Sequence, residues 1–174
     1  MPIDKAVAGL GFIAAVGGAT RMLMTPFSLL WGANGSPELW AGLLACWLMA
    51  VGTLGLFLVQ ASRTGVLGFA SSLAIAASNM ITGCLVWSTM LGAEPTGYEL
   101  VRTVNDALML LGLLVFGIVT WRARVLPRWA AVLTVVWPVV GFFPFLGDYM
   151  ALLWGLAYVG LGVPAWLGNG RAAA

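Results

Sequence analysis

Histidine is absent from this chain of 174 residues, and charged residues make up only 8% of it. Without histidine, the chain cannot form histidine-ligated haem sites, HExxH metalloprotease motifs or histidine-based catalytic triads. Its two cysteines, Cys46 and Cys84, form no CxxC pair, so we expect two buried free thiols and no redox centre. No metal site and no cofactor is therefore expected.

The scarcity of charge also limits the partners of the chain. A net charge of +2, scattered along the sequence, is too small for a surface that binds nucleic acid. Soluble domains contain about 25% charged residues, whereas this chain is 61% hydrophobic with a mean hydropathy of +1.01. We therefore expect a protein embedded in a bilayer, with membrane lipids as its immediate partners.

Long apolar stretches define the expected fold. A helix that crosses a membrane needs about 20 mostly apolar residues, and a search for such stretches between turn residues and charges finds six. They run approximately over 6–30, 39–61, 66–91, 106–123, 129–146 and 148–168. The prediction is an all-α protein in which residues 1–174 form a single domain, a bundle of six transmembrane helices.

Basic residues predict the orientation of this bundle, because lysine and arginine near helix ends are retained in the cytoplasm. Arg102 lies on one side of the predicted bundle. The other basic residues near helix ends lie on the opposite side: Lys5, Arg63, Arg122, Arg124, Arg128 and Arg171. Both termini are therefore predicted to be cytoplasmic. The abundance of alanine, glycine, arginine and tryptophan with a single lysine indicates a bacterium with a GC-rich genome, so the expected location is a bacterial inner membrane.

Most carboxylates lie on the predicted outer side, and helix capping explains most of them. Ser36, Pro37 and Glu38 fit an N-cap followed by an acidic first turn, and Thr103 to Asp106 has the spacing of a capping box. Asp148 opens the last predicted helix, where a carboxylate complements the helix dipole. A binding or catalytic role for these acids remains the alternative.

Arg21 has no such explanation, because it lies about two-thirds along the first predicted span. A guanidinium in the bilayer centre costs at least about 2.5 kcal/mol, so it needs a partner or a wet cavity. The acids nearest in depth are Asp106 and Asp148. Arg21 is therefore expected either to form an internal ion pair, to contact a ligand, or to reach the outer interface. Pro26 is expected to kink the helix beyond it.

Polar residues at helical spacing predict which faces turn inward. The first three spans carry such stripes: Arg21 and Thr25 belong to the first, Cys46 and Thr53 to the second, and the third runs beside Asn79. These faces are expected either to meet in a polar seam or simply to pack helices together. Most tryptophans lie near helix ends and fit an aromatic belt. Three lie deeper and are candidates for lining a cavity: Trp87, Trp137 and Trp154. Pro138 and Pro144 are expected to bend or break the fifth helix.

Three functional hypotheses remain open. The first is a protein that binds or transports an amphiphilic or lipid-like small molecule in a cavity in the outer half of the bilayer. Its candidate binding residues are Arg21, Asn79, Trp87, Trp137 and Trp154. No Walker motif is present, so transport energy would come from a partner or an ion gradient.

The second hypothesis is a membrane-embedded enzyme that acts on an isoprenoid-like substrate by acid catalysis. Such chemistry needs a protonated carboxylic acid in an apolar site, with aromatic faces that stabilise a carbocation. The candidate acids are Asp148 and Asp106, and both need burial for this role. The third hypothesis is an accessory subunit that packs into a homo-oligomer or a larger membrane complex through its glycine-rich helix faces.

Overall fold

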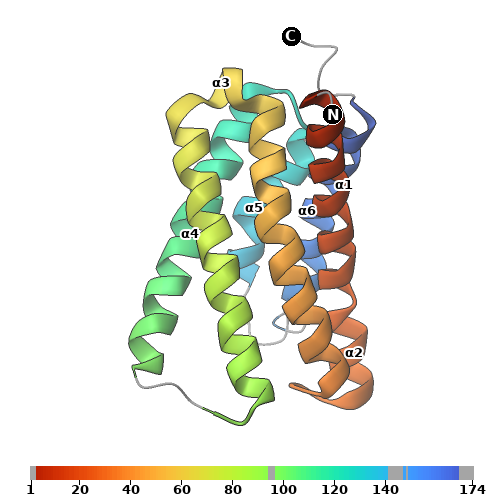
Figure 1. The fold of residues 1–174 in the computed structure, drawn as a ribbon, viewed down its shortest axis with the longest axis vertical. Coiled ribbons are helices and arrows are strands. Elements are labelled where there is room, and N and C mark those ends of the chain that lie inside the picture. The colour runs from red at the N-terminus through yellow and green to blue at the C-terminus, as the bar shows by residue number, and fades with distance from the viewer. Residues whose placement is uncertain (1–2, 94–96, 141–146, 148, 169–174) are drawn as a thin grey trace.

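The described chain is entirely helical. The computed structural model describes residues 3–93, 97–140, 147 and 149–168, and no strand occurs among them. The helices, shown in Figure 1, are α1 (Ile3–Met22), α2 (Met24–Trp31), α3 (Ser36–Met90), α4 (Tyr98–Ala123), α5 (Arg128–Val140) and α6 (Met150–Leu167). The predicted all-α class is confirmed.

Four helices are long and apolar enough to cross a membrane. These candidate spans are Asp4–Trp31, which joins α1 and α2, then Ser36–Met90, Tyr98–Ala123 and Met150–Leu167. The chain is therefore a multi-pass membrane protein. The expected set of six separate spanning helices is corrected to four candidate spans, for two physical reasons.

The first reason is that two predicted spans belong to one helical element, α3, which bends at Gly65. Its 55 residues would measure about 80 Å if straight, far more than the 30 Å of a bilayer core. Gly65 has non-helical backbone angles of φ 54° and ψ −144°, and the chain turns back at this end of the bundle (Figure 1). The predicted spans 39–61 and 66–91 correspond to the two arms of α3.

The second reason is the shortness of α5. It has 13 residues with Pro138 inside it and ends at Val140, whereas the predicted span continued to residue 146. Pro138 removes a backbone donor but lies within the continuous helix, and the predicted continuation over residues 141–146 lies outside the described residues. Pro144 and Asp148 lie outside the described residues.

The starts of α3 and α4 correct the expected helix caps. The N-cap of α3 is Gly35, and Ser36 is already helical, while the Glu38 carboxylate accepts a hydrogen bond from the Asn34 backbone N–H at 2.7 Å. α4 begins at Tyr98 and not at residue 106. Asp106 therefore lies about two turns inside α4 and caps nothing.

Close helix contacts at small residues hold the bundle together. α1 packs most extensively against α6 and then against α3. At the α1–α6 contact, a Cβ atom on Gly18 would lie 2.5 Å from the carbonyl oxygen of Gly155. Small residues let membrane helices approach this closely. α1 ends at Met22 and α2 starts at Met24, so the helix is interrupted where Pro26 leaves the Met22 carbonyl without its helical donor, although Leu23 between them keeps helical angles of φ −65° and ψ −19°.

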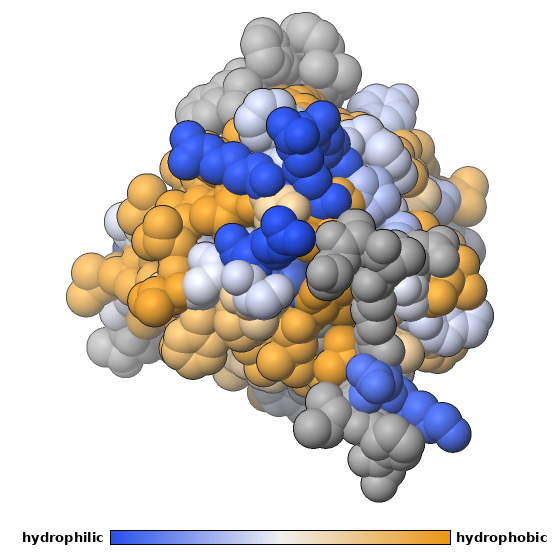
Figure 2. Space-filling model, turned by 90° about the horizontal axis from the view of Figure 1, so that it is seen from above, coloured by the Kyte–Doolittle hydropathy of each residue, from blue (hydrophilic) through white to orange (hydrophobic). Residues whose placement is uncertain are grey.

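The outer surface of the bundle is apolar, as a lipid-facing surface requires. Large hydrophobic side chains are exposed along every helix. Half-exposed tryptophans lie near both ends of the bundle. At the end with the Gly65 bend they are Trp121, Trp129 and Trp166, and at the other end Trp31, Trp40 and Trp87. Figure 2 shows hydrophilic residues gathered at the bend end within a hydrophobic surround. This arrangement is that of an aromatic belt.

Candidate functional site

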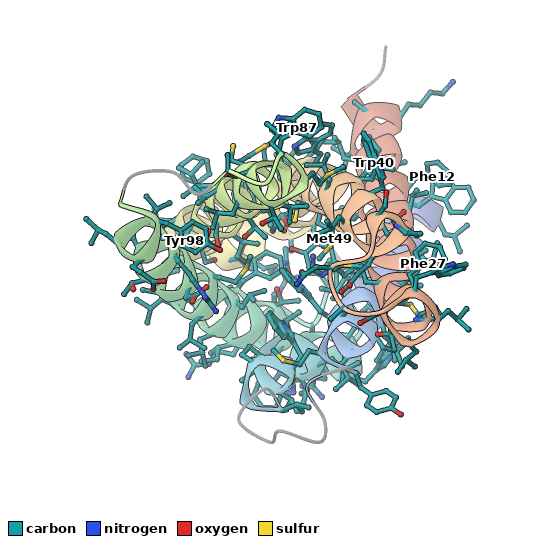
Figure 3. All side chains as sticks on the ribbon, turned by 90° about the horizontal axis from the view of Figure 1, so that it is seen from below. Phe12, Phe27, Trp40, Met49, Trp87 and Tyr98 are labelled. Atoms are coloured by element: carbon teal, nitrogen blue, oxygen red, sulfur yellow. The ribbon has the colours of Figure 1, made fainter. Side chains whose placement is uncertain are left out.

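A cavity of about 690 Å³ opens at the end of the bundle opposite the Gly65 bend. Figure 3 views this end, with Phe27 of α2 and Tyr98 of α4 on opposite sides of the ring of helices. Every helix contributes to the lining, and α3 does so from both arms. Representative residues, in chain order, are Arg21, Thr25, Glu38, Thr82, Asp106, Trp137 and Trp154.

The deep part of the cavity contains a stack of one cation and two indoles. The guanidinium carbon of Arg21 lies 4.1 Å from the centre of the Trp154 ring. Trp154 in turn stacks on Trp137, with ring centres 4.4 Å apart and planes inclined by 8°. Trp154 is 3% exposed and Trp137 is 7% exposed. Arg21 Nη1 also lies 3.9 Å from Sγ of buried Cys46, so a soft thiol and an aromatic face are its close neighbours.

Three buried donors of this stack have no hydrogen-bond acceptor among the residues that the structure describes. They are Nε of Arg21 and the indole Nε1 atoms of Trp137 and Trp154. A buried donor without an acceptor costs about 1–3 kcal/mol, and buried polar groups in folded proteins are normally paired. All three side chains line the same cavity. The deep end of the cavity therefore holds a cluster of hydrogen-bond donors without acceptors among the described residues.

The mouth of the cavity carries charges of both signs. Arg102 and Asp106 lie one turn apart on the same exposed face of α4, and Glu38 is half-buried on α3. Together with Arg21, the lining has two arginines and two carboxylates, so its formal charge balances. Positive charge nevertheless dominates the deep part, where Arg21 lies against the indoles.

One wall of the cavity is fixed by a hydrogen-bond network between α3 and α4. The Ser78 hydroxyl donates to the side-chain oxygen of Asn105 at 2.7 Å, and the Asn105 amide donates to the Thr82 hydroxyl at 3.0 Å. Ser78 is fully buried, and Asn105 is 5% exposed. Asn105 and Thr82 line the cavity, so this network sets the separation of the two helices there.

Four of the residues selected from the sequence line this cavity together. Arg21, Trp137 and Trp154 form its deep end, and Asp106 lies at its mouth. Asp148 is outside the described residues. The expected ion pair between Arg21 and Asp106 does not form. Among the described residues, the close contacts of the Arg21 guanidinium are with Cys46 and Trp154, and no carboxylate forms an ion pair with it.

The other two selected residues lie elsewhere. Asn79 is fully buried on α3, where its amide donates to the Ile75 carbonyl at 3.0 Å and its side-chain oxygen is unpaired. It is not among the residues that line the cavity. Trp87 is 45% exposed and packs edge-on against Trp40 at 6.2 Å on the outer surface. Trp87 therefore belongs with the aromatic belt.

Three residues of the site escaped the sequence reasoning. Glu38 and Arg102 were assigned to helix capping and to topology, although the spacing of Arg102 and Asp106 placed both on one helix face. The contact of Cys46 with Arg21 is not predicted either, because the sequence indicates only a buried free thiol at this position. Cys84, expected to be buried, is exposed.

The architecture and the cavity define a class: a multi-pass α-helical membrane protein with a polar cavity at one end of an apolar bundle. Comparison with protein-family models, with curated proteins and with solved structures gave no match.

Proposed function

We propose that this protein binds an anionic amphiphile, with the anionic group held at the deep end of the cavity by Arg21, Trp137 and Trp154. The observation that carries the proposal is the set of three buried donors without acceptors around one cavity. An oxygen-rich anion, a phosphate or a carboxylate, supplies the acceptors that this set lacks.

The free energy of Arg21 supports an anionic ligand. A guanidinium inside a bilayer costs at least about 2.5 kcal/mol, and a cation–π contact returns about 0.5–2 kcal/mol. The neighbouring thiol is a weak acceptor. An anion in the cavity neutralises the guanidinium and pairs its Nε, so binding offsets the cost of burying Arg21.

The other two hypotheses have less support. Acid catalysis needs a buried carboxylic acid, and Asp106 is exposed at the mouth. The accessory-subunit hypothesis needs glycine-rich outer faces, but the tightest glycine contacts lie inside the bundle, as at Gly18 and Gly155. A homo-oligomer or a larger complex remains compatible with a ligand-binding cavity.

The proposed setting is a bacterial inner membrane, with both termini cytoplasmic and the cavity in the outer half of the bilayer. α1 begins and α6 ends at the same end of the bundle (Figure 1), as an even number of crossings requires. That end also carries Arg63, Arg122 and Arg128, which supports its cytoplasmic location. The sequence contains no nucleotide-binding motif. Transport of the ligand across the membrane would therefore take its energy from a partner protein or from an ion gradient.

Native mass spectrometry of protein extracted gently from its own membrane tests the proposal. We expect the wild-type protein to retain an acidic lipophilic adduct and Arg21→Met to lose it, because methionine keeps an apolar contact with Trp154 but removes the charge. Arg122→Met is the matched control, since Arg122 is an exposed arginine at the other end of the bundle, and it should keep the adduct.

Two results would contradict the proposal. Equal adducts in the wild-type protein and in folded Arg21→Met would show that Arg21 does not hold the ligand. A stoichiometric protein partner without any adduct would favour the accessory-subunit hypothesis.

A further inference from the structure

A second hollow, an apolar groove of about 450 Å³, lies on the outer surface between the second arm of α3 and the start of α4. It is lined by Met80, Ile81, Cys84, Leu85 and Ser88 of α3 and by Val101 of α4. Met80, Cys84 and Val101 are exposed, so the groove faces the surroundings of the bundle.

Leu85 connects this groove to the cavity, because it lines both of them. Figure 1 shows the second arm of α3 and the first turns of α4 diverging toward the same end. The Ser78–Asn105–Thr82 network holds the two helices together further from that end. Leu85 is thus the shared wall between a polar interior and an apolar exterior, at the point where two helices separate.

The two spaces differ in what they accept. The cavity has two arginines and two carboxylates in its lining, and packing a hydrocarbon chain against them would strip water from charged groups. The groove is almost wholly apolar and adjoins lipid. An amphiphile therefore fits the pair of spaces when its head lies in the cavity and its chain leaves through the wall at Leu85.

We propose that the ligand enters sideways from the bilayer between α3 and α4, and that its hydrocarbon chain stays in the groove beside Cys84 while its anionic head reaches Arg21. This inference rests on the proposed function and specifies it: the ligand is a lipid-like anion with a long chain and not a free anion. The hydrocarbon chain of the ligand stays in an apolar environment throughout. Only the anionic head changes its environment on binding, from the membrane surface to the polar cavity.

Alkylation of Cys84 by N-ethylmaleimide in lipid nanodiscs tests this route. Cys84 is an exposed free thiol in the groove, whereas Cys46 is fully buried, and mass spectrometry of the adduct confirms the labelled position. The probes are hexadecyl phosphate and butyl phosphate, which share a head and differ in chain length. We expect both to bind, as read by native mass spectrometry, and only hexadecyl phosphate to slow alkylation several-fold.

Two variants separate the head site from the chain site. Ile81→Trp fills the groove, which Ile81 lines without lining the cavity, so we expect it to abolish protection of Cys84 while butyl phosphate still binds. Leu73→Trp is the matched control, because Leu73 is an exposed leucine of α3 that lines neither space. Arg21→Met should remove both binding and protection.

The outcomes distinguish the two proposals. If both phosphates bind but hexadecyl phosphate does not protect Cys84, the lateral route is wrong and the proposed anion site stands. Protection that is unchanged in Arg21→Met would mean that the groove holds surface lipid only, and this also overturns the route. If neither phosphate binds, both proposals fail.

Discussion

Thr53 of α3 and Tyr158 of α6 form a hydrogen bond of 2.6 Å in the interior of the bundle, and both are almost fully buried. The Thr53 hydroxyl donates to the Met49 carbonyl at 2.6 Å. Its single proton is engaged there. In the bond between the two side chains, Tyr158 is therefore the donor and Thr53 the acceptor.

Removal of either hydroxyl should therefore have different effects. Tyr158→Phe leaves Thr53 with its backbone bond, and we expect a loss of about 0.6 kcal/mol, typical of bonds between membrane helices. Thr53→Val leaves the Tyr158 hydroxyl buried without an acceptor, and the expected loss is about 1–3 kcal/mol. Thermal unfolding in detergent measures both, and Tyr149→Phe, at an exposed tyrosine, is the control. Equal losses for the two variants would contradict the assigned donor.

Residue-scale prediction from sequence succeeded where burial has a high free-energy cost. Arg21 stood out because a charge inside an apolar span needs compensation, and of the three tryptophans expected to lie deep, Trp137 and Trp154 line the cavity. The contacts of Arg21 could not be predicted, because a cation–π stack depends on how α1, α5 and α6 rotate against one another. Spacing along one helix contains no information about that rotation.

At the scale of elements, substitutions at three glycines, Gly9 and Gly18 of α1 and Gly65 of α3, distinguish the cost of backbone strain from the cost of steric crowding. A Cβ on Gly9 or Gly65 would meet nothing within 4 Å, whereas one on Gly18 would collide with α6. Gly65 differs from Gly9 in its positive φ of 54°. Gly9→Ala is therefore a common control for substitutions at the other two positions.

Gly65→Ala tests the bend of α3. A side chain in this backbone conformation costs about 1–3 kcal/mol, so we expect a loss of that size in the free energy of unfolding, although space is open around it. Gly9→Ala should cause no loss. Stability that is unchanged in Gly65→Ala would mean that the bend does not need a glycine.

Gly18→Ala tests the contact between α1 and α6. The added methyl group would lie 2.5 Å from the Gly155 carbonyl oxygen, so the helices must move apart, at an expected cost of about 1–3 kcal/mol. Thermal unfolding beside Gly9→Ala measures this cost. A variant as stable as Gly9→Ala would show that the two helices separate without penalty.

Helix boundaries were predicted well where apolar stretches end and poorly where a helix continues through polar sequence. The start of α4 was expected at residue 106, but the helix extends back to Tyr98 through charged residues such as Arg102. A search for apolar stretches cannot detect these turns, because Glu99 and Arg102 interrupt the apolar sequence there. That same extension places Arg102 on one face with Asp106 at the cavity mouth, so the boundary error also concealed part of the candidate site.

At the scale of the whole molecule, the arginines at the Gly65 end predict the orientation in the membrane. We expect a green fluorescent protein fused to the C-terminus to fluoresce and alkaline phosphatase at the same place to be inactive, because the first folds in the cytoplasm and the second outside it. Alkaline phosphatase inserted after Gly92, between α3 and α4, should be active. The reverse pattern at both positions, the C-terminus and Gly92, would place the cavity on the cytoplasmic side.

The extensive packing of α1 against α6 has a consequence for how the protein assembles during its synthesis. α1 is synthesised before α6, with α2 to α5 between them, so α1 waits in the membrane with its glycine face uncovered until α6 has been inserted. During this interval Arg21 also lacks the Trp154 ring that later covers it. Closure of the bundle is therefore a post-insertion event, and a chain arrested before α6 presents membrane quality-control proteases with an exposed arginine and an open seam.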